Sequence, residues 1–296
     1  MIEKGKTFQV VTHLIFLLLC LLCLIPFVLM IASSVTSETV LIKEGYSFWP
    51  KEMSWDAYRY ILMDTGAFVR GYIISVMITF WGSILSLVVT TLYAYPLSRK
   101  DLPGRNAVSF FLFFTMLFNG GLIPRYMMWT QSFHIKNTYA AYIFPNLLMS
   151  AFYVIMMRTY MTTSIPEDII DAAKVDGAGE VRILLKIVMP ISKPILATLA
   201  LLTGLGYWND WVNGLYFVTN DRYYSIQVLL NRMLLDLQFL MSNASQLAGS
   251  GIQIGMLPTM GIKMAMAVLG VLPMLIIYPL FQRYFVQGIT IGAVKG

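Results

Sequence analysis

Long apolar runs, separated by shorter polar segments, dominate the chain. Six of them are long enough for a helix to cross about 30 Å of hydrocarbon, which takes about 20 residues. They cover Val10–Ala32, Tyr72–Tyr95, Ala107–Met128, Ala140–Met157, Ile187–Trp211 and Met260–Tyr284. Barrel strands alternate apolar and polar residues, whereas these runs are continuously apolar. The pattern therefore predicts an all-α integral membrane protein, a single transmembrane domain over residues 1–296 with six membrane-spanning helices.

Composition excludes a large soluble domain. Hydrophobic residues make up 58% of the chain and charged residues 12%, and a soluble globular chain has about twice that charged share. The net charge is +6, but Lys and Arg are scattered singly and form no run typical of nucleic-acid binding. Cys20 and Cys23 lie one helical turn apart in the first apolar run, with no further ligand nearby, which favours simple packing over a metal or redox site.

The polar segments predict the orientation. The short segment Pro96–Asn106 carries Arg99, Lys100 and Arg105 against a single acid, Asp101, and basic residues gather on the cytoplasmic side of a membrane. We therefore expect both termini in the cytoplasm and residues 33–71 and 216–257 outside, the latter with a small, polar loop at Ser242–Gly251. The first apolar run is longer than the about 7–15 residues of a signal-peptide core and lacks a small-x-small site at its end, so it is expected to be a retained helix.

The inner segment 164–194 differs from the other polar segments. Ser164 and Glu167 have the spacing of a capping box, with Pro166 in the first turn. Ile165, Ile169 and Ala173, with Ile170 alongside, give the following helix one apolar stripe. Gly177 and Gly179 end this helix, and a second one runs from about Glu180 to Pro190.

The result is a helix–turn–helix elbow with small residues at its tip. Ala172, Ala173, Gly177 and Ala178 would let this tip enter a groove on another protein, because no bulky side chain holds the two backbones apart. The residues alone equally allow a solvated linker with an amphipathic helix on the membrane surface.

Polar and aromatic residues interrupt the fifth apolar run. Sugar recognition needs flat aromatic faces and hydrogen-bonding groups, and polar residues within a span usually face a cavity or a partner. Candidates for a substrate path are Tyr207, Trp208, Asn209, Asp210, Trp211 and Asn213, with Asn119 and Asn146 as weaker ones. The alternative is that Asn209 and Asp210 tie helices together while the two Trp side chains lie in the interfacial aromatic belt.

Machinery for catalysis is absent from the sequence pattern. The fragment Gly5-Lys6-Thr7 matches only the second half of a phosphate-binding loop, which also needs a glycine five positions before its second glycine. The chain is therefore not expected to hydrolyse ATP. The twenty methionines do not cluster at ligand spacing and are expected to pack. We expect no enzyme activity, no metal site and no cofactor bound by this chain.

The segment Asp171-Ala172-Ala173, then Asp176-Gly177-Ala178, and later Ile187-Val188-Met189-Pro190 and Pro194, resembles the EAA loop of ABC-importer permeases. It departs from the family pattern at Asp171, where Glu is usual, and at Met189, where Leu is usual. Trp208-Asn209-Asp210 and the tail Tyr284–Gly296 resemble permeases of maltose-type carbohydrate importers. Phe118–Pro124 is similar to a subgroup that takes up oligosaccharides from polysaccharides, some of them acidic.

This resemblance implies that the chain is one subunit of a larger transporter. Such a permease of the bacterial cytoplasmic membrane works with a second, related permease, two copies of an ATPase subunit that bind ATP and Mg, and an extracellular or periplasmic solute-binding protein. The residues implied in ATPase coupling are Asp171, Ala172, Ala173, Asp176, Gly177, Ala178 and Pro190. The tail is implied to reach the ATPase, and Ser242–Gly251 to probe the binding protein.

An ion-gradient-driven secondary transporter is the alternative function. It would place carboxylates at mid-membrane and use paired broken helices, and Asp210 is the one obvious acidic candidate, near the end of its run. The sequence leaves open which sugar is carried and which of the two permeases binds it.

Overall fold

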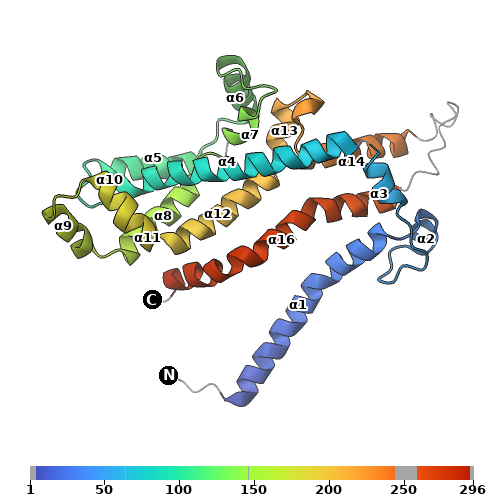
Figure 1. Ribbon diagram of the computed structural model, residues 1–296, viewed down its shortest axis with the longest axis horizontal. Coiled ribbons are helices and arrows are strands. Elements are labelled where there is room, and N and C mark those ends of the chain that lie inside the picture. The colour runs from blue at the N-terminus through green and yellow to red at the C-terminus, as the bar shows by residue number, and fades with distance from the viewer. Residues whose placement is uncertain (1–4, 64, 146, 244–258, 294–296) are drawn as a thin grey trace. The chain divides into compact units, whose positions relative to one another are not determined.

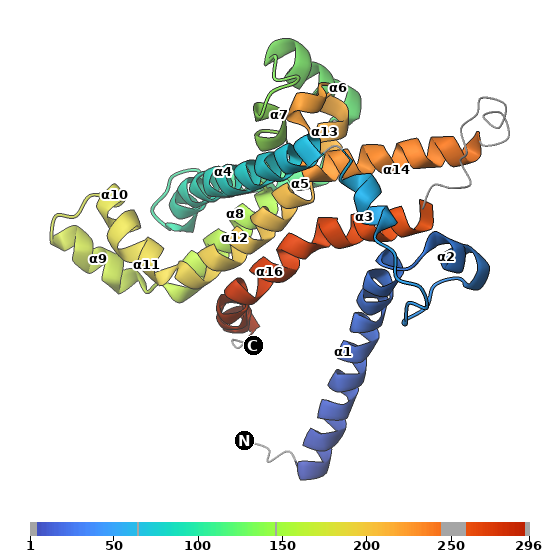
Figure 2. The ribbon, with the colours of Figure 1, turned by 45° about the vertical axis from the view of Figure 1, so that its right-hand side comes forward.

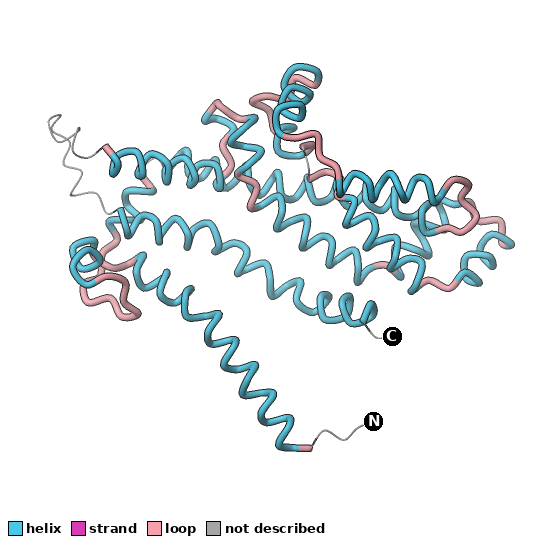
Figure 3. Tube along the Cα trace, turned by 180° about the vertical axis from the view of Figure 1, so that it is seen from behind, coloured by secondary structure: helices cyan, strands magenta, loops and turns pink. Residues whose placement is uncertain are grey.

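The computed structural model describes residues 5–63, 65–145, 147–243 and 259–293, and these are almost entirely helical, as Figure 3 shows. The one β pairing among them is an isolated bridge between Thr36 and Met53. Contacts divide the chain into two compact units, Met1–Phe68 with Leu230–Pro273 and Val69–Leu229 with Met274–Gly296. The prediction of an all-α fold is confirmed.

The first unit joins the N-terminal part of the chain to residues 230–273. It contains α1 (Lys6–Ser34), α2 (Glu38–Glu44), α3 (Asp56–Ile61), most of α14 (Ile226–Ser242) and the first part of α16 (Thr259–Ala293). The Glu38 carboxylate accepts hydrogen bonds from the Met260 and Gly261 N–H groups at 2.9 and 3.0 Å and from Thr259 Oγ1 at 3.1 Å. A carboxylate on the first N–H groups of a helix satisfies donors that have no partner within it, so α2 anchors the start of α16.

The second unit holds the candidate site. Its elements are α4 (Thr65–Ser98), α5 (Arg105–Leu117), α6 (Leu122–Met127), η1 (Met128–Ser132), α7 (Ala140–Ile143), α8 (Ala151–Ser164), α9 (Glu167–Val175), α10 (Glu180–Ile183), η2 (Leu184–Val188), α11 (Met189–Ile191), α12 (Lys193–Trp208), α13 (Val212–Phe217) and η3 (Asp221–Tyr223). The helices α4, α5, α8 and α12 run lengthwise; α9, α10 and α11 gather at one end and α6, α7 and α13 at the other (Figures 1 and 2).

The hydrophobic core of this unit has two parts. One surrounds Val154, Met157, Ile183 and Leu199, which are fully buried, and it reaches Ile170 and Ala173 of α9. The other surrounds Tyr142, Tyr207 and Phe217 at the α7 and α13 end. The α9 to α11 elbow is therefore part of the folded bundle rather than a free linker.

Three of the six predicted spans are single long apolar helices among the described residues: Phe8–Ser34, Thr65–Ser98 and Thr259–Pro279. Two more exist only if a bent pair counts as one span, Arg105–Leu117 with Leu122–Ser132 (110°) and Glu180–Ile191 with Lys193–Trp208 (81°). The structure thus gives three to five spans, and the count of six is not confirmed.

The predicted span Ala140–Met157 is broken. The helix α7 ends at Ile143 and α8 begins at Ala151. Pro145 explains the break, because proline has no N–H to donate and disfavours a helical conformation in the residue before it.

The two bends also have local causes. At the first, Gly121 has a left-handed backbone (φ 86°) and its N–H donates to Asn119 Oδ1 at 2.8 Å. At the second, Ser192 leaves the helical conformation (ψ 5°) between α11 and α12, and Pro194, two residues later, has no N–H to continue the α-helical ladder.

The segments predicted as outer loops contain helices. Residues 33–71 include α2, α3 and the first turns of α4, which begins at Thr65 rather than Tyr72. Residues 216–257 include the 17-residue α14. Most of the loop Ser242–Gly251 and the candidate Asn146 lie outside the described residues. The division into one permease domain with an inner loop and two outer segments stays a prediction.

Candidate functional site

The turn after α9 is a defined helix ending. The Ala178 N–H donates to Ala173 O at 2.9 Å and the Gly177 N–H to Lys174 O at 3.0 Å, the paired bonds of a Schellman motif. Gly177 has φ 78°, which other L-residues rarely adopt. Gly179 has ordinary extended backbone ahead of α10, so only one of the two glycines is required by the turn.

The start of α9 differs from the prediction. Pro166, not Ser164, is the residue before the helix, and no side chain caps it. The expected capping box is therefore wrong. Proline disfavours helix in Ile165, the residue that precedes it, and this moves the helix start two residues on. Glu167 and Asp168 lie in the first turn, where acidic groups favour the positive end of the helix.

The apolar stripe of α9 is also placed differently. Ile170 and Ala173 are buried, whereas Ile169 is 43% exposed. Val175 and Val181 are 88% and 71% exposed, so the elbow presents aliphatic side chains outward. Among the predicted coupling residues, Asp171, Ala172, Asp176, Gly177 and Pro190 are exposed, Ala178 is half-buried and Ala173 is buried. The exposed tip is thus small and partly apolar, as a docking surface requires.

Ion pairs link the elbow to the α4–α5 loop, residues 99–104. Lys174 Nζ lies 3.0 Å from Asp101 Oδ2 and 3.2 Å from Glu180 Oε1. The second Glu180 oxygen accepts a hydrogen bond from Tyr95 at the end of α4. Lys100 Nζ lies 2.7 Å from Glu167 Oε2. Charged residues are visible on both inner segments of the sequence, but nothing in it indicates which of them pair, so these residues were not predicted as part of the site.

The charges shift the pKa values of their partners. The hydrogen bond from Lys174 holds the pKa of Asp101 below its usual value of 3.8, and the bond to Asp101 raises the pKa of Lys174 above 10.5. Lys100 likewise lowers the pKa of Glu167. Each shift favours the charged form, so these groups stay ionised near neutral pH.

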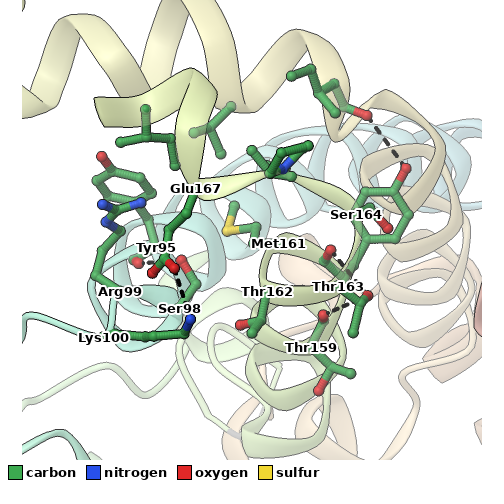
Figure 4. Close-up of a pocket in the computed structure, with 16 residues that line it drawn as sticks. Tyr95, Ser98, Arg99, Lys100, Thr159, Met161, Thr162, Thr163, Ser164 and Glu167 are labelled. Carbon is green, nitrogen blue, oxygen red and sulfur yellow. Dashed lines mark hydrogen bonds and ion pairs between the residues drawn. The ribbon is translucent and has the colours of Figure 1, made fainter. Parts of the chain in front are cut away.

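A cavity of about 800 Å³ lies between the end of α4, the last turns of α8 and the segment that leads into α9. Figure 4 shows Arg99, Lys100 and Glu167 on one side of it and the α8 residues Thr159, Thr162 and Thr163 on the other. The helix α9 therefore does not pack continuously on the bundle.

The polar residues of the fifth run lie at the other end of the unit. Tyr207 is 3% exposed and its hydroxyl donates to Ile143 O at 3.0 Å. Asn213 is buried and its Nδ2 donates to Pro145 O at 3.0 Å. Both side chains thus bond carbonyls at the break between α7 and α8, where the helix no longer supplies partners.

Two further candidates complete this tie. Asp210 accepts from the Asn213 N–H at 3.0 Å and from Asn213 Nδ2 at 2.8 Å. Trp208 is 2% exposed and lies against Tyr72 with 6.0 Å between ring centroids. This geometry supports the structural alternative to a substrate path, in which side chains hold neighbouring segments together, for Tyr207, Trp208, Asp210 and Asn213. Asn209, Trp211 and Asn119 are exposed, and for them the substrate path stays a prediction.

No group of three or more His, Cys, Asp or Glu able to hold a metal ion occurs among the described residues. The backbone of the tail lies in α16 as far as Ala293, while the side chains of residues 280–296 are outside the description.

Comparison with known proteins gives a consistent result. The family described as "Binding-protein-dependent transport system inner membrane component" matches residues 5–291. The polygalacturonan/rhamnogalacturonan transport system permease protein YtcP of Bacillus subtilis is 33% identical, covering 99% of this chain and 100% of the relative. The melibiose/raffinose/stachyose import permease protein MelC of the same organism is 26% identical over 99% of each chain. A solved chain from a bacterial ABC transporter involved in the import of the acidic polysaccharide alginate has a TM-score of 0.77 and 28% identity, covering 96% of this chain and 99% of that one.

Proposed function

The chain belongs to the family of binding-protein-dependent transport system inner membrane components, the permeases of ABC importers, and from this we propose that it carries an acidic, polysaccharide-derived oligosaccharide into the cell. We further propose that a second permease completes the path and that two ATPase subunits bind this chain through the elbow of α9 and α10. A solute-binding protein would deliver the sugar from outside, and both termini would be cytoplasmic.

The observation that carries the coupling role is the outward face of the elbow. Ile169 and Val175 of α9 and Val181 of α10 are exposed, although apolar side chains in water are costly unless a partner covers them. The Schellman turn at Gly177 fixes their direction. A multi-pass permease without its own ATP-binding loop needs such a rigid contact to receive the ATPase movement.

The docking role is tested with Ile169→Asp in the complete complex. We expect the ATPase subunit to be retained on washed membranes about tenfold less, as for a central interface residue. Ile42→Asp is the matched control, since Ile42 is an exposed aliphatic residue of α2 in the predicted outer segment. Equal retention in the two variants would contradict docking at α9.

The similarity to a permease named for polygalacturonan and rhamnogalacturonan and to a chain of a transporter involved in alginate import supports an acidic substrate, whereas MelC is named for neutral sugars. Uptake of labelled digalacturonate and of raffinose into proteoliposomes containing the complete transporter separates these classes. We expect ATP-dependent uptake of digalacturonate. Preference for raffinose would contradict the acidic class, and uptake on an ion gradient without the ATPase would contradict an ABC importer.

A further inference from the structure

The position of α9 is not set by packing alone. Of its nine residues, only Ile170 and Ala173 are buried, and the cavity of about 800 Å³ lies on the side of the helix that faces the bundle. A short helix held by two side chains can rotate or tilt. Something else must fix it if it is to transmit a movement.

Ion pairs occur at both ends of this helix. At its first turn Glu167 pairs with Lys100 at 2.7 Å, and in its last turn Lys174 pairs with Asp101 at 3.0 Å. Both partners belong to the α4–α5 loop. Lys174 also reaches Glu180 of α10, which accepts the Tyr95 hydroxyl. Two attachments on one loop fix the tilt and the rotation of α9 together.

We propose that the α4–α5 loop is a second arm of the coupling device, in which Lys100 and Asp101 are positioning residues that tie α9 to the end of α4. A displacement of α9 would then move α4 directly, in addition to moving α12 along the chain through α10 and α11. This proposal rests on the proposed docking of the ATPase at α9.

A purely stabilising role is a poor explanation of these pairs. The side chains of Lys100 and Asp101 are 69% and 60% exposed, and exposed ion pairs contribute little to folding stability. Their removal should therefore leave the fold and the docking surface intact. What it should change is how far a movement of α9 is transmitted.

The experiment uses the complete transporter in proteoliposomes, with digalacturonate-loaded binding protein as the stimulus. Lys174→Gln, Asp101→Asn and the double variant are each expected to retain the ATPase subunit. The stimulation of ATP hydrolysis by the binding protein should fall by about three- to tenfold, the size expected when one link of a coupling network is lost. The double variant should be no worse than either single one.

Lys186→Gln is the matched control. It removes the same charge from the same elbow, and Lys186 is exposed with no ion pair among the described residues. Exchange of the Lys100–Glu167 charges tests for rescue. Lys100→Glu and Glu167→Lys should each reduce the stimulation of ATP hydrolysis, and the two substitutions together should restore most of it.

Each outcome decides the proposal. Stimulation in Lys174→Gln equal to that in Lys186→Gln would overturn it, and so would a charge exchange that restores nothing. Loss of the ATPase subunit from Lys174→Gln membranes would overturn it too, because Lys174 would then belong to the docking surface. Failure of the wild-type chain to retain the ATPase would instead contradict the proposed function itself.

Discussion

At the residue scale, Gly177 carries the turn of the elbow. An added Cβ at Gly177 would meet no heavy atom within 4 Å, so only its left-handed backbone opposes a side chain. That conformation costs an ordinary L-residue about 1–2 kcal/mol. We expect Gly177→Ala to loosen the end of α9 and speed amide hydrogen exchange in residues 167–178 by about 5- to 30-fold.

Gly179 provides the control for this prediction. It also has free space around its Cβ position, but its φ is −70°. Gly179→Ala should leave the exchange rates unchanged. A similar effect of the two substitutions would mean that the turn does not depend on the left-handed residue.

The contribution of the Lys174–Asp101 pair to coupling is predicted not to change with pH near neutrality. The pKa of Asp101 is lowered, so its contribution is present at neutral pH and is lost only as the pH falls through that lowered value. The pKa of Lys174 is raised, so its contribution is lost only as the pH rises above 10.5. The ratio of binding-protein-stimulated hydrolysis in wild type to that in Lys174→Gln should stay constant from about pH 6 to pH 9. A ratio that changes more than about twofold in this range would contradict ion pairing as the cause.

At the scale of elements, α4 and α12 approach closely at a glycine. A Cβ on Gly82 would lie 2.6 Å from the Tyr207 ring, and Tyr207 cannot move away because it is buried and bonded to Ile143 O. Gly82→Ala should therefore lower the free energy of unfolding by about 1–3 kcal/mol, measured as thermal unfolding in detergent. At Gly204 the nearest atom is 3.6 Å away, and Gly204→Ala should cost far less.

In the first unit, the carboxylate of Glu38 is predicted to stabilise the start of α16. It bonds the first N–H groups of α16 across 222 and 223 positions of sequence, and losing a side chain cap costs about 0.5–2 kcal/mol. Glu38→Ala should reduce the stability of the protein by this amount in the same unfolding assay. Glu44→Ala, which removes only an exposed pair with Lys51, should have little effect, and an equal loss would contradict the cap.

A comparison of the predicted and observed helices shows which of them could be predicted from the sequence. The apolar runs predicted α1, α4 and α16, and the spacing of small residues predicted the elbow. Pro145 was visible, but the side chains that make a break there tolerable, Tyr207 and Asn213, come from more than 60 positions away. Their polar groups therefore suggested a sugar path, whereas in the structure they donate hydrogen bonds to the carbonyls of Ile143 and Pro145. The pairing of Lys174 with Asp101 was equally hidden, because it depends on which loops share one end of the bundle.

At the scale of the whole molecule, that same ion pair constrains the topology. Asp101 and Lys174 lie 3.0 Å apart, so the α4–α5 loop and the elbow are on the same side of the membrane. The chain between them must then cross an even number of times. If α5 crosses outward, α7 and α8 must together cross back, even though α8 has 14 residues and is only about 21 Å long.

Single cysteines test this crossing. In a chain with Cys20 and Cys23 replaced by Ser, Asn106→Cys and Val175→Cys should react with an impermeant maleimide only from the cytoplasmic side. Lys136→Cys should react only from outside; all three positions are exposed. The carbonyl bonds from Tyr207 and Asn213 make a partly non-helical crossing possible, because they satisfy acceptors that lipid cannot. If Lys136→Cys reacts from the same side as Asn106→Cys, α5 and η1 form a re-entrant hairpin and the chain crosses the membrane two times fewer than we predict.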